Sequence, residues 1–123
     1  MASLGKKTIL LVEDEPMLRL IGADALADAG YEVIEAASAD EALALLEAVE
    51  EVQILFTDIR MPGSMNGLEL AEMVHARWPH MKILITSGDT WPPKGAIPDD
   101  GRFLAKPYKI ASLQREVDDL WGG

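Results

Sequence analysis

Short apolar runs recur along this chain, and longer segments of mixed polarity separate them. The strongest runs are Thr8–Val12, 54–57 and 82–86, and weaker ones cover 31–36 and 103–105. Runs this short and this rich in β-branched residues are typical of strands that are buried on both faces. We therefore predict a strand at each of these positions.

The segments between the runs carry the spacing of amphipathic helices, with apolar residues at steps of three and four. Pro16 suits the first turn of the first helix, and Gly30 supplies its stop. Ser38, with Glu41 three residues later, predicts a capping box at the start of the second helix. The apolar residues that mark the helices are Leu18, Ile21, Ala25 and Ala29 in the first; Ala42, Leu45, Leu46 and Val49 in the second; Leu68, Ala71 and Val74 in the third, expected over Gly67–Arg77; and Ile110, Leu113, Val117 and Leu120 in the last.

Strands that alternate with helices predict βαβ units and a parallel sheet, with right-handed crossovers that place helices on both faces. The predicted fold class is therefore α/β and doubly wound. The alternation breaks at residues 89–101, where Pro92, Pro93 and Pro98, together with Gly95, oppose a regular helix. We expect an ordered loop there, so that the fourth helix is short or absent.

Polar side chains follow four of the predicted strands at the points where the strands end. They are Glu13 and Asp14, Asp58, Ser87, and Lys106. Asp58 closes the run 54–57 and precedes a loop with proline and glycine, so we expect it to face the connection and not the core. Because ligands of parallel sheets bind at the carboxyl ends of the strands, these side chains are expected to converge on one site.

Carboxylates gathered in this way would raise one another's pKa values unless a cation lay between them. Oxygen ligands of this kind favour Mg²⁺, which Asp14 and Asp58 can bind directly and Glu13 through water. Asp58 can then act as a nucleophile toward phosphorus and form an aspartyl phosphate. In that reaction Lys106 would offset charge on the phosphoryl oxygens, and Ser87 would hydrogen-bond one of them.

Composition narrows the classes of function. A chain of 123 residues with 49% hydrophobic side chains predicts a single domain over residues 1–123, with its core at about residues 7–121. A net charge of −10 without a cluster of Lys and Arg argues against nucleic-acid binding. No cysteine and no membrane-spanning run is present in the sequence, so we expect a cytoplasmic protein that binds proteins, cations or phosphorylated groups.

Taken together and in order, these residues resemble the receiver domain of two-component response regulators. The resemblance is carried by Glu13-Asp14, Asp58 with Met61-Pro62 and Gly67, Ser87-Gly88, and Lys106-Pro107, and it runs from about Lys7 to Leu120. It implies a flavodoxin-like, CheY-like fold with strand order 2-1-3-4-5. It also implies a signalling phosphoacceptor, not an enzyme, that takes a phosphoryl group from a histidine kinase or phosphotransfer protein and then switches its contacts with a downstream protein. Homodimerisation is compatible with this interpretation.

The resemblance also assigns roles to residues. Asp58 would be the phosphoacceptor; Glu13, Asp14, Asp58 and the Arg60 backbone carbonyl would position Mg²⁺; Ser87 and Lys106 would bind the phosphoryl group; Phe103 would be the switch aromatic that moves with Ser87; and the bond before Pro107 would be cis. The chain departs from the family at residues 89–101, where receivers usually carry a helix that reports phosphorylation. Its loop after Met61-Pro62 is also one residue longer than the common pattern.

Other functions remain open. A Mg²⁺-dependent phosphohydrolase would use Asp58 for turnover, but haloacid-dehalogenase-like phosphatases carry a second Asp two residues on, where this chain has Arg60. The intact set of acids, hydroxyl and lysine argues against an interaction module that works without phosphate. A stand-alone regulator and a receiver excised from a hybrid histidine kinase fit equally well. We expect His75 and His80 at the surface, and Trp91 either as a partner contact or as a core plug.

Overall fold

The computed structural model describes residues 7–48, 51–89, 91–93, 95–98 and 101–122. The elements are β1 (Thr8–Val12), α1 (Pro16–Asp28), β2 (Glu32–Ala36), α2 (Ala39–Ala48), β3 (Ile54–Asp58), α3 (Gly67–Arg77), β4 (Lys82–Ser87), β5 (Arg102–Ala105) and α4 (Ile110–Gly122). Each strand begins and ends within one residue of its predicted bounds. In this part of the chain, no helix has the length and apolar character needed to span a membrane.

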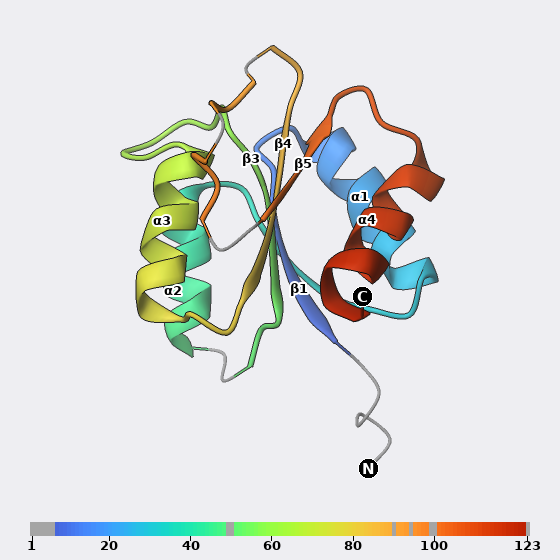
Figure 1. Ribbon diagram of the computed structural model, residues 1–123, viewed down its shortest axis with the longest axis horizontal. Coiled ribbons are helices and arrows are strands. Elements are labelled where there is room, and N and C mark those ends of the chain that lie inside the picture. The colour runs from blue at the N-terminus through green and yellow to red at the C-terminus, as the bar shows by residue number, and fades with distance from the viewer. Residues whose placement is uncertain (1–6, 49–50, 90, 94, 99–100, 123) are drawn as a thin grey trace.

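The strands form one parallel sheet in the order β2-β1-β3-β4-β5. Figure 1 shows α1 and α4 on one face of the sheet and α2 and α3 on the other. The α/β doubly wound fold and the strand order 2-1-3-4-5 are therefore confirmed. Asp58 pairs with Thr86, and Ser87 pairs with Ala105, so the ends of β3, β4 and β5 meet at one edge.

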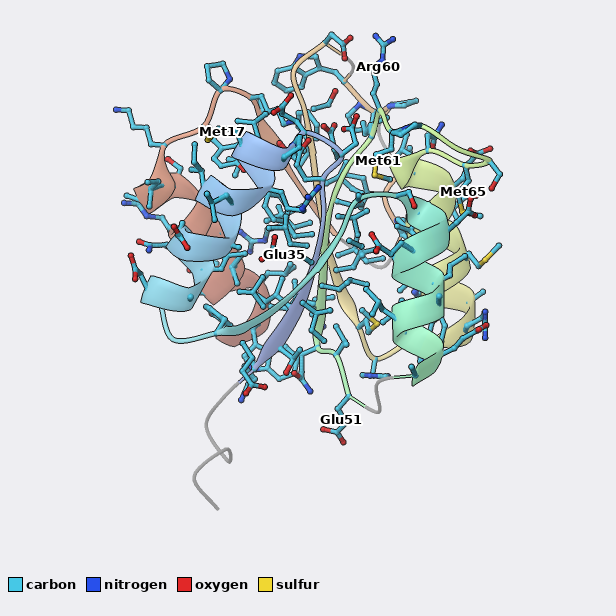
Figure 2. The ribbon with its side chains drawn as sticks, turned by 180° about the vertical axis from the view of Figure 1, so that it is seen from behind. Met17, Glu35, Glu51, Arg60, Met61 and Met65 are labelled. Carbon is cyan, nitrogen blue, oxygen red and sulfur yellow. The ribbon has the colours of Figure 1, made fainter. Side chains whose placement is uncertain are left out.

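Alternate residues of each strand supply two separate apolar cores. In β1, Leu10 and Val12 pack with the α2 and α3 layer, whereas Ile9 and Leu11 pack with the α1 and α4 layer. Side chains fill both layers in Figure 2. Because full burial of such a side chain contributes about 1.5–3 kcal/mol, the two cores make the sheet a stable platform for its carboxyl edge.

The inward face of α1 differs from the prediction. Leu18 and Ile21 were expected inside but are 41% and 43% exposed, and of the four predicted residues Ala25 is the buried one. The buried residues of α1 are Gly22, Ala23, Ala25 and Leu26. A Cβ added to Gly22 would lie 3.3 Å from Cδ2 of Leu11, so the small residues let the helix approach β1 closely and turn the larger ones outward.

The starts of α2 and α3 show how side chains satisfy free backbone N–H groups. The Glu41 N–H donates to Oγ of Ser38, as predicted, but the Glu41 carboxylate accepts from the Ala37 N–H in place of the Ser38 N–H. At α3, Asn66 and Glu69 form a complete capping box that the sequence reading missed. On the buried face of α2, Val49 lies outside the described residues.

Between β4 and β5, the described residues 89, 91–93, 95–98 and 101 form packed irregular chain where a helix would continue the alternation. Among the described residues of this segment there is no helix or strand, as its prolines predict. The rings of Trp91 and Phe103 lie 4.8 Å apart between centroids, and Ile97 packs against the α2 and α3 core. The described residues of this segment therefore lie against β4 and β5 on the side of α3 (Figure 1).

Candidate functional site

Three acidic residues meet at the carboxyl edge of the sheet. Glu13 and Asp14 follow β1, and Asp58 ends β3, which lies beside β1. One carboxylate oxygen from each of the three lies within 4.8 Å of the others. Glu13 and Asp58 are only 4% and 7% exposed, whereas Asp14 is open to solvent. Asp58 thus lies at the end of its strand as predicted. Its side chain is buried, however, where the sequence predicted that it would face the loop that follows.

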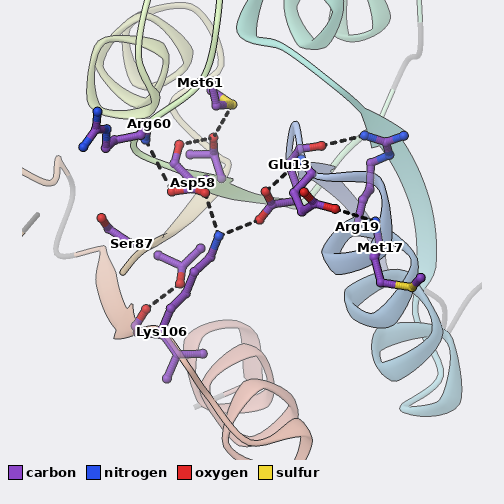
Figure 3. Close-up of polar contacts among 12 residues, drawn as sticks. Glu13, Met17, Arg19, Asp58, Arg60, Met61, Ser87 and Lys106 are labelled. Carbon is purple, nitrogen blue, oxygen red and sulfur yellow. Dashed lines mark hydrogen bonds and ion pairs between the residues drawn. The ribbon is translucent and has the colours of Figure 1, made fainter. Parts of the chain in front are cut away.

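Lys106 compensates for the burial of these acids. Its Nζ donates to Oδ2 of Asp58 at 2.7 Å and to Oε1 of Glu13 at 2.9 Å (Figure 3). Burial alone would lower the pKa of Lys106, but its hydrogen bonds and charge interactions with Asp58 and Glu13 outweigh burial and raise that pKa. The side chain is therefore a stable cation. It precedes Pro107 through a cis peptide bond, as the resemblance implies.

Glu13 is held by contacts on both its side chain and its backbone. Burial raises the pKa of its carboxyl group, and hydrogen bonds from Lys106 and from the Glu15 N–H partly offset that rise. The backbone carbonyl of Glu13 accepts a 2.7 Å hydrogen bond from Nη1 of Arg19. Nε of the same arginine forms an ion pair with Glu35. The sequence reading missed Arg19, because helical spacing marks it only as a polar position on α1.

The backbone around Asp58 is packed against the start of α3. A Cβ at Gly67 would overlap the carbonyl oxygen of Asp58, so only glycine fits there. The Gly67 N–H donates to the carbonyl of Ile59 at 2.8 Å, and the Arg60 N–H donates to Oδ1 of Asp58 at 3.3 Å. Both oxygens of the Asp58 carboxylate are therefore oriented, one by Lys106 and one by the backbone after the strand.

Ser87 ends β4 beside the acidic group, and Phe103 lies on the neighbouring strand β5. Ser87 is buried at the end of β4, on the far side of Lys106 from Glu13 (Figure 3). Its Oγ donates to Oδ1 of Asp89 and accepts from the Asp89 N–H, both at 3.4 Å. Phe103 is half-buried in β5, and its ring packs against that of Trp91. Trp91 therefore covers Phe103 while most of its own side chain stays exposed.

Arg60 points away from the acids and toward Asp89. Its Nη1 forms an ion pair with Oδ2 of Asp89, and Figure 2 shows Arg60 extending beyond the end of the sheet. Arg60 also lines a cavity of about 600 Å³, together with Asp14, Ile59, Met61, Pro62 and Asn66. The pairing with Asp89 was missed because it joins two loops that lie far apart in the sequence.

The two histidines take no part in this cluster. His80 is exposed, as predicted, but His75 is only partly exposed, and its Nδ1 is buried without a hydrogen-bond partner. Among the described residues, the group of His, Asp and Glu side chains placed to hold a metal ion is Glu13, Asp14 and Asp58. The histidines are therefore not candidate metal ligands.

Comparison with known sequences identifies relatives of most of the chain. The model of the response regulator receiver domain matches residues 9–118. The chain is 37% identical over 122 residues to the sensor kinase CckA of Brucella abortus (strain 2308), a match that covers 94% of this chain and 13% of that kinase. It spans between 13% and 25% of the length of the first curated relatives that it matches.

Solved structures share the whole fold. A response regulator receiver protein from Sinorhizobium medicae WSM419 superposes with a TM-score of 0.89, at 30% identity and with 98% of each chain covered. TrrA from Thermotoga maritima, solved in complex with Mg²⁺-BeF, gives a TM-score of 0.83 at 27% identity and covers 93% of this chain and 98% of its own. With its fold matched from end to end and the family model spanning residues 9–118, this chain belongs to the response regulator receiver domains.

Proposed function

We propose that Asp58 is the residue on which this receiver domain accepts its phosphoryl group. Receiver domains are signalling phosphoacceptors of two-component systems, and membership of the family gives this chain that general function. The observation that supports Asp58 is its position at the end of β3, buried and hydrogen-bonded to Lys106. The donor would be the phosphohistidine of a histidine kinase or phosphotransfer protein.

In the transfer, one carboxylate oxygen of Asp58 forms a bond to phosphorus. The bond between phosphorus and the imidazole nitrogen of the donor breaks, and its electron pair stays on the imidazole. Lys106 remains cationic at neutral pH because its pKa is raised, and it offsets negative charge on the phosphoryl oxygens. Ser87, at the adjacent strand end, would donate its hydroxyl to one of the same oxygens. These residues catalyse the transfer on their own domain, without turnover of a separate substrate.

The acidic group fits Mg²⁺ by its donor chemistry and by its charge. Three carboxylates lie within 4.8 Å of one another, and one ammonium group, that of Lys106, balances them only in part. Glu13, Asp14, Asp58 and the backbone carbonyl of Arg60 would hold the ion. When bound, Mg²⁺ supplies positive charge to the oxygens of the phosphoryl group during transfer.

A direct test is labelling with Mg²⁺ and a small phosphodonor such as phosphoramidate, followed by intact mass. We expect one phosphoryl group on the native chain, none on Asp58→Asn, and native labelling of Asp24→Asn, which changes an exposed Asp of α1. Equal labelling of the native chain and Asp58→Asn would reject Asp58 as the acceptor. Sustained hydrolysis of a phosphomonoester would instead support the phosphohydrolase, which the sequence disfavours because Arg60 stands where haloacid-dehalogenase-like phosphatases carry a second Asp.

We further propose that the phosphodonor protein docks on the exposed apolar side of α1. The residues of this α1 patch are Met17, Leu18, Leu20 and Ile21. Apolar side chains exposed together in this way mark interaction sites more often than isolated ones do. A cavity of about 440 Å³ connects the patch to the acceptor site, because its lining includes Ile21, Tyr108 and Lys106, and Lys106 hydrogen-bonds Asp58. A donor seated on the patch would thus reach the acceptor.

The output surface is proposed to include residues 89–101. Phosphorylation would draw Ser87 and this segment toward the phosphate, and a downstream protein would bind the altered surface near Trp91 and Phe103. Trp91 is exposed and its ring contacts that of Phe103, so a movement of Phe103 would displace Trp91 at the surface.

We propose a cytoplasmic location and protein partners, with no role for nucleic acid. Homodimerisation, and the activity of any longer protein that contains this domain, are further proposals.

A further inference from the structure

Arg19 connects α1 and β2 to the backbone of the acidic group. It lies in the first turn of α1, and its Nη1 donates a 2.7 Å hydrogen bond to the backbone carbonyl of Glu13 (Figure 3). Its Nε lies 3.4 Å from Oε1 of Glu35 in β2. We propose that Arg19 is a positioning residue for Mg²⁺, because it fixes the peptide that carries Asp14. The inference rests on the proposed Mg²⁺ site.

Asp14 is the acid of the group that needs support from its backbone. The carboxylates of Glu13 and Asp58 are both held by the ammonium group of Lys106. The side chain of Asp14 is exposed and has no hydrogen-bond partner among the described residues. The direction of its carboxylate toward the other two acids is therefore set by the backbone on which it stands.

The peptide between Glu13 and Asp14 is planar, so the direction of the Glu13 carbonyl also fixes the N–H and the Cα of Asp14. On one side of this peptide, the Glu13 N–H donates to the carbonyl of Ala36 at 3.0 Å. On the other side, the Glu15 N–H donates to Oε2 of Glu13 at 3.1 Å. Arg19 binds the carbonyl between these two points, and a hydrogen bond from a charged donor is stronger than a neutral one. The peptide is thereby held in one orientation.

The stability of α1 does not account for an arginine at this position. The first turn of α1 contains no acidic residue, and a cation near a helix N-terminus opposes the helix dipole. The guanidinium group of Arg19 instead contacts Glu13 and Glu35, which both lie outside the helix. Glu35 balances the charge of Arg19, so the pair holds the peptide without adding net positive charge beside a site for a cation.

Order in the ligands before binding favours a metal such as Mg²⁺, which demands near-ideal octahedral geometry. Without the bond from Arg19, the peptide before Asp14 could rotate, and Mg²⁺ would have to order it on binding. Removal of the guanidinium group should therefore weaken Mg²⁺ binding. Charge alone has the opposite consequence, because the loss of a cation near the site would strengthen the binding of another cation. The sign of the change separates these two effects.

The test measures the Mg²⁺ dissociation constant of the unphosphorylated domain from its stabilisation against urea as MgCl₂ is raised. Arg19→Met keeps a long, unbranched side chain and removes the guanidinium group. We expect its Mg²⁺ dissociation constant to rise by about three- to tenfold. Arg19→Gln is too short to reach the carbonyl in the same way and should show a similar rise, which guards against a folding failure of the Met variant. Arg19→Lys keeps a charged donor and should recover at least part of the affinity.

Labelling by the small phosphodonor gives a second readout. The Mg²⁺ concentration that gives half of the maximal labelling rate should rise by the same factor in Arg19→Met. The rate at saturating Mg²⁺ should stay close to native, because Arg19 does not contact Asp58. A purely structural role would lower stability without Mg²⁺ and leave the dissociation constant unchanged. Arg77→Met is the matched control, because Arg77 forms an ion pair with Glu47 between α3 and α2, and it should keep the native constant.

A native or lower dissociation constant in Arg19→Met and Arg19→Gln would overturn the positioning role. An equal rise in Arg77→Met would overturn it as well. Failure of the proposed function gives a different result. If Mg²⁺ does not stabilise the native chain, the proposed metal site and this inference fail together. If Mg²⁺ stabilises the native chain and the Arg19 variants equally, the role of Arg19 alone fails.

Discussion

The ammonium group of Lys106 lies 2.7 Å from the carboxylate of Asp58, so a cation from the end of β5 contacts the acid at the end of β3. The two strands are not neighbours, because β4 lies between them. Lys106 therefore bridges the carboxyl edge of the sheet. The same ammonium contacts Glu13 after β1, so one side chain balances the charge brought by two other strands.

Replacing Lys106 by Met should destabilise the metal-free domain. Asp58 and Glu13 would then lose their shared cation while remaining buried, and we expect a loss of roughly 1–3 kcal/mol in the free energy of unfolding. Urea unfolding in the presence of a chelator measures it. Added Mg²⁺ should recover part of the loss by supplying positive charge. Lys109→Met, at an exposed position two residues after Pro107, is the control and should stay close to native.

Replacing Glu13 by Gln should instead stabilise the metal-free domain, and the size of this stabilisation should depend on pH. Burial is the largest cause that raises the pKa of Glu13, so the folded state favours the protonated acid and ionisation costs stability. The cost is absent below the pKa of the unfolded chain and appears as pH rises through the higher folded pKa. In chelator, the variant should therefore match native stability near pH 4 and exceed it at pH 7, as judged by urea unfolding. A native chain more stable than the variant at pH 7 would contradict this reasoning.

Gly67→Ala should disrupt the link between α3 and the acceptor strand. The new Cβ would overlap the carbonyl oxygen of Asp58, so the backbone would have to move, at a cost of roughly 1–3 kcal/mol or more. Thermal or urea unfolding measures the loss, and labelling of Asp58 should slow with it. Gly88→Ala is a matched control for stability, because its Cβ would lie 3.6 Å from the Lys106 Cβ, an ordinary contact. Similar losses in both variants would show that the close approach is not the cause.

The strands and the acidic edge could be predicted because their signals are local. A buried parallel strand needs a short apolar run, and the acid, hydroxyl or amine that follows it is brought to the edge by the topology alone. Glu13, Asp58 and Lys106 were therefore placed together from the sequence, although Asp58 proved to be buried. Its buried carboxylate is compensated by Lys106, which lies 48 residues away in the sequence.

Features that depend on packing were not predictable in this way. The helical spacing in α1 is equally well satisfied by Leu18 and Ile21 or by the smaller residues around Gly22, and the close approach to β1 favours the small ones. The contact between Trp91 and Phe103 joins an irregular segment to a strand, where no periodicity exists to reveal it. Hydrophobicity alone therefore placed Leu18 and Ile21 in the core, where only Ala25 of the predicted residues is buried, and it left the role of Trp91 undecided.

The exposed face of α1 leads to the last prediction, because it separates docking from chemistry. Leu20 is 53% exposed within the α1 patch, so Leu20→Glu should leave the fold intact while placing a charge where a protein donor would bury apolar surface. We expect transfer from a histidine kinase or phosphotransfer protein that labels the native domain to slow by about tenfold or more. Labelling by the small phosphodonor, which needs only the acceptor site, should remain native. Met73→Glu, at a 38% exposed position on α3, is the control and should retain both activities. Equal loss of both activities in Leu20→Glu would indicate damage to the acceptor site, and native transfer from the protein donor would place the docking surface elsewhere.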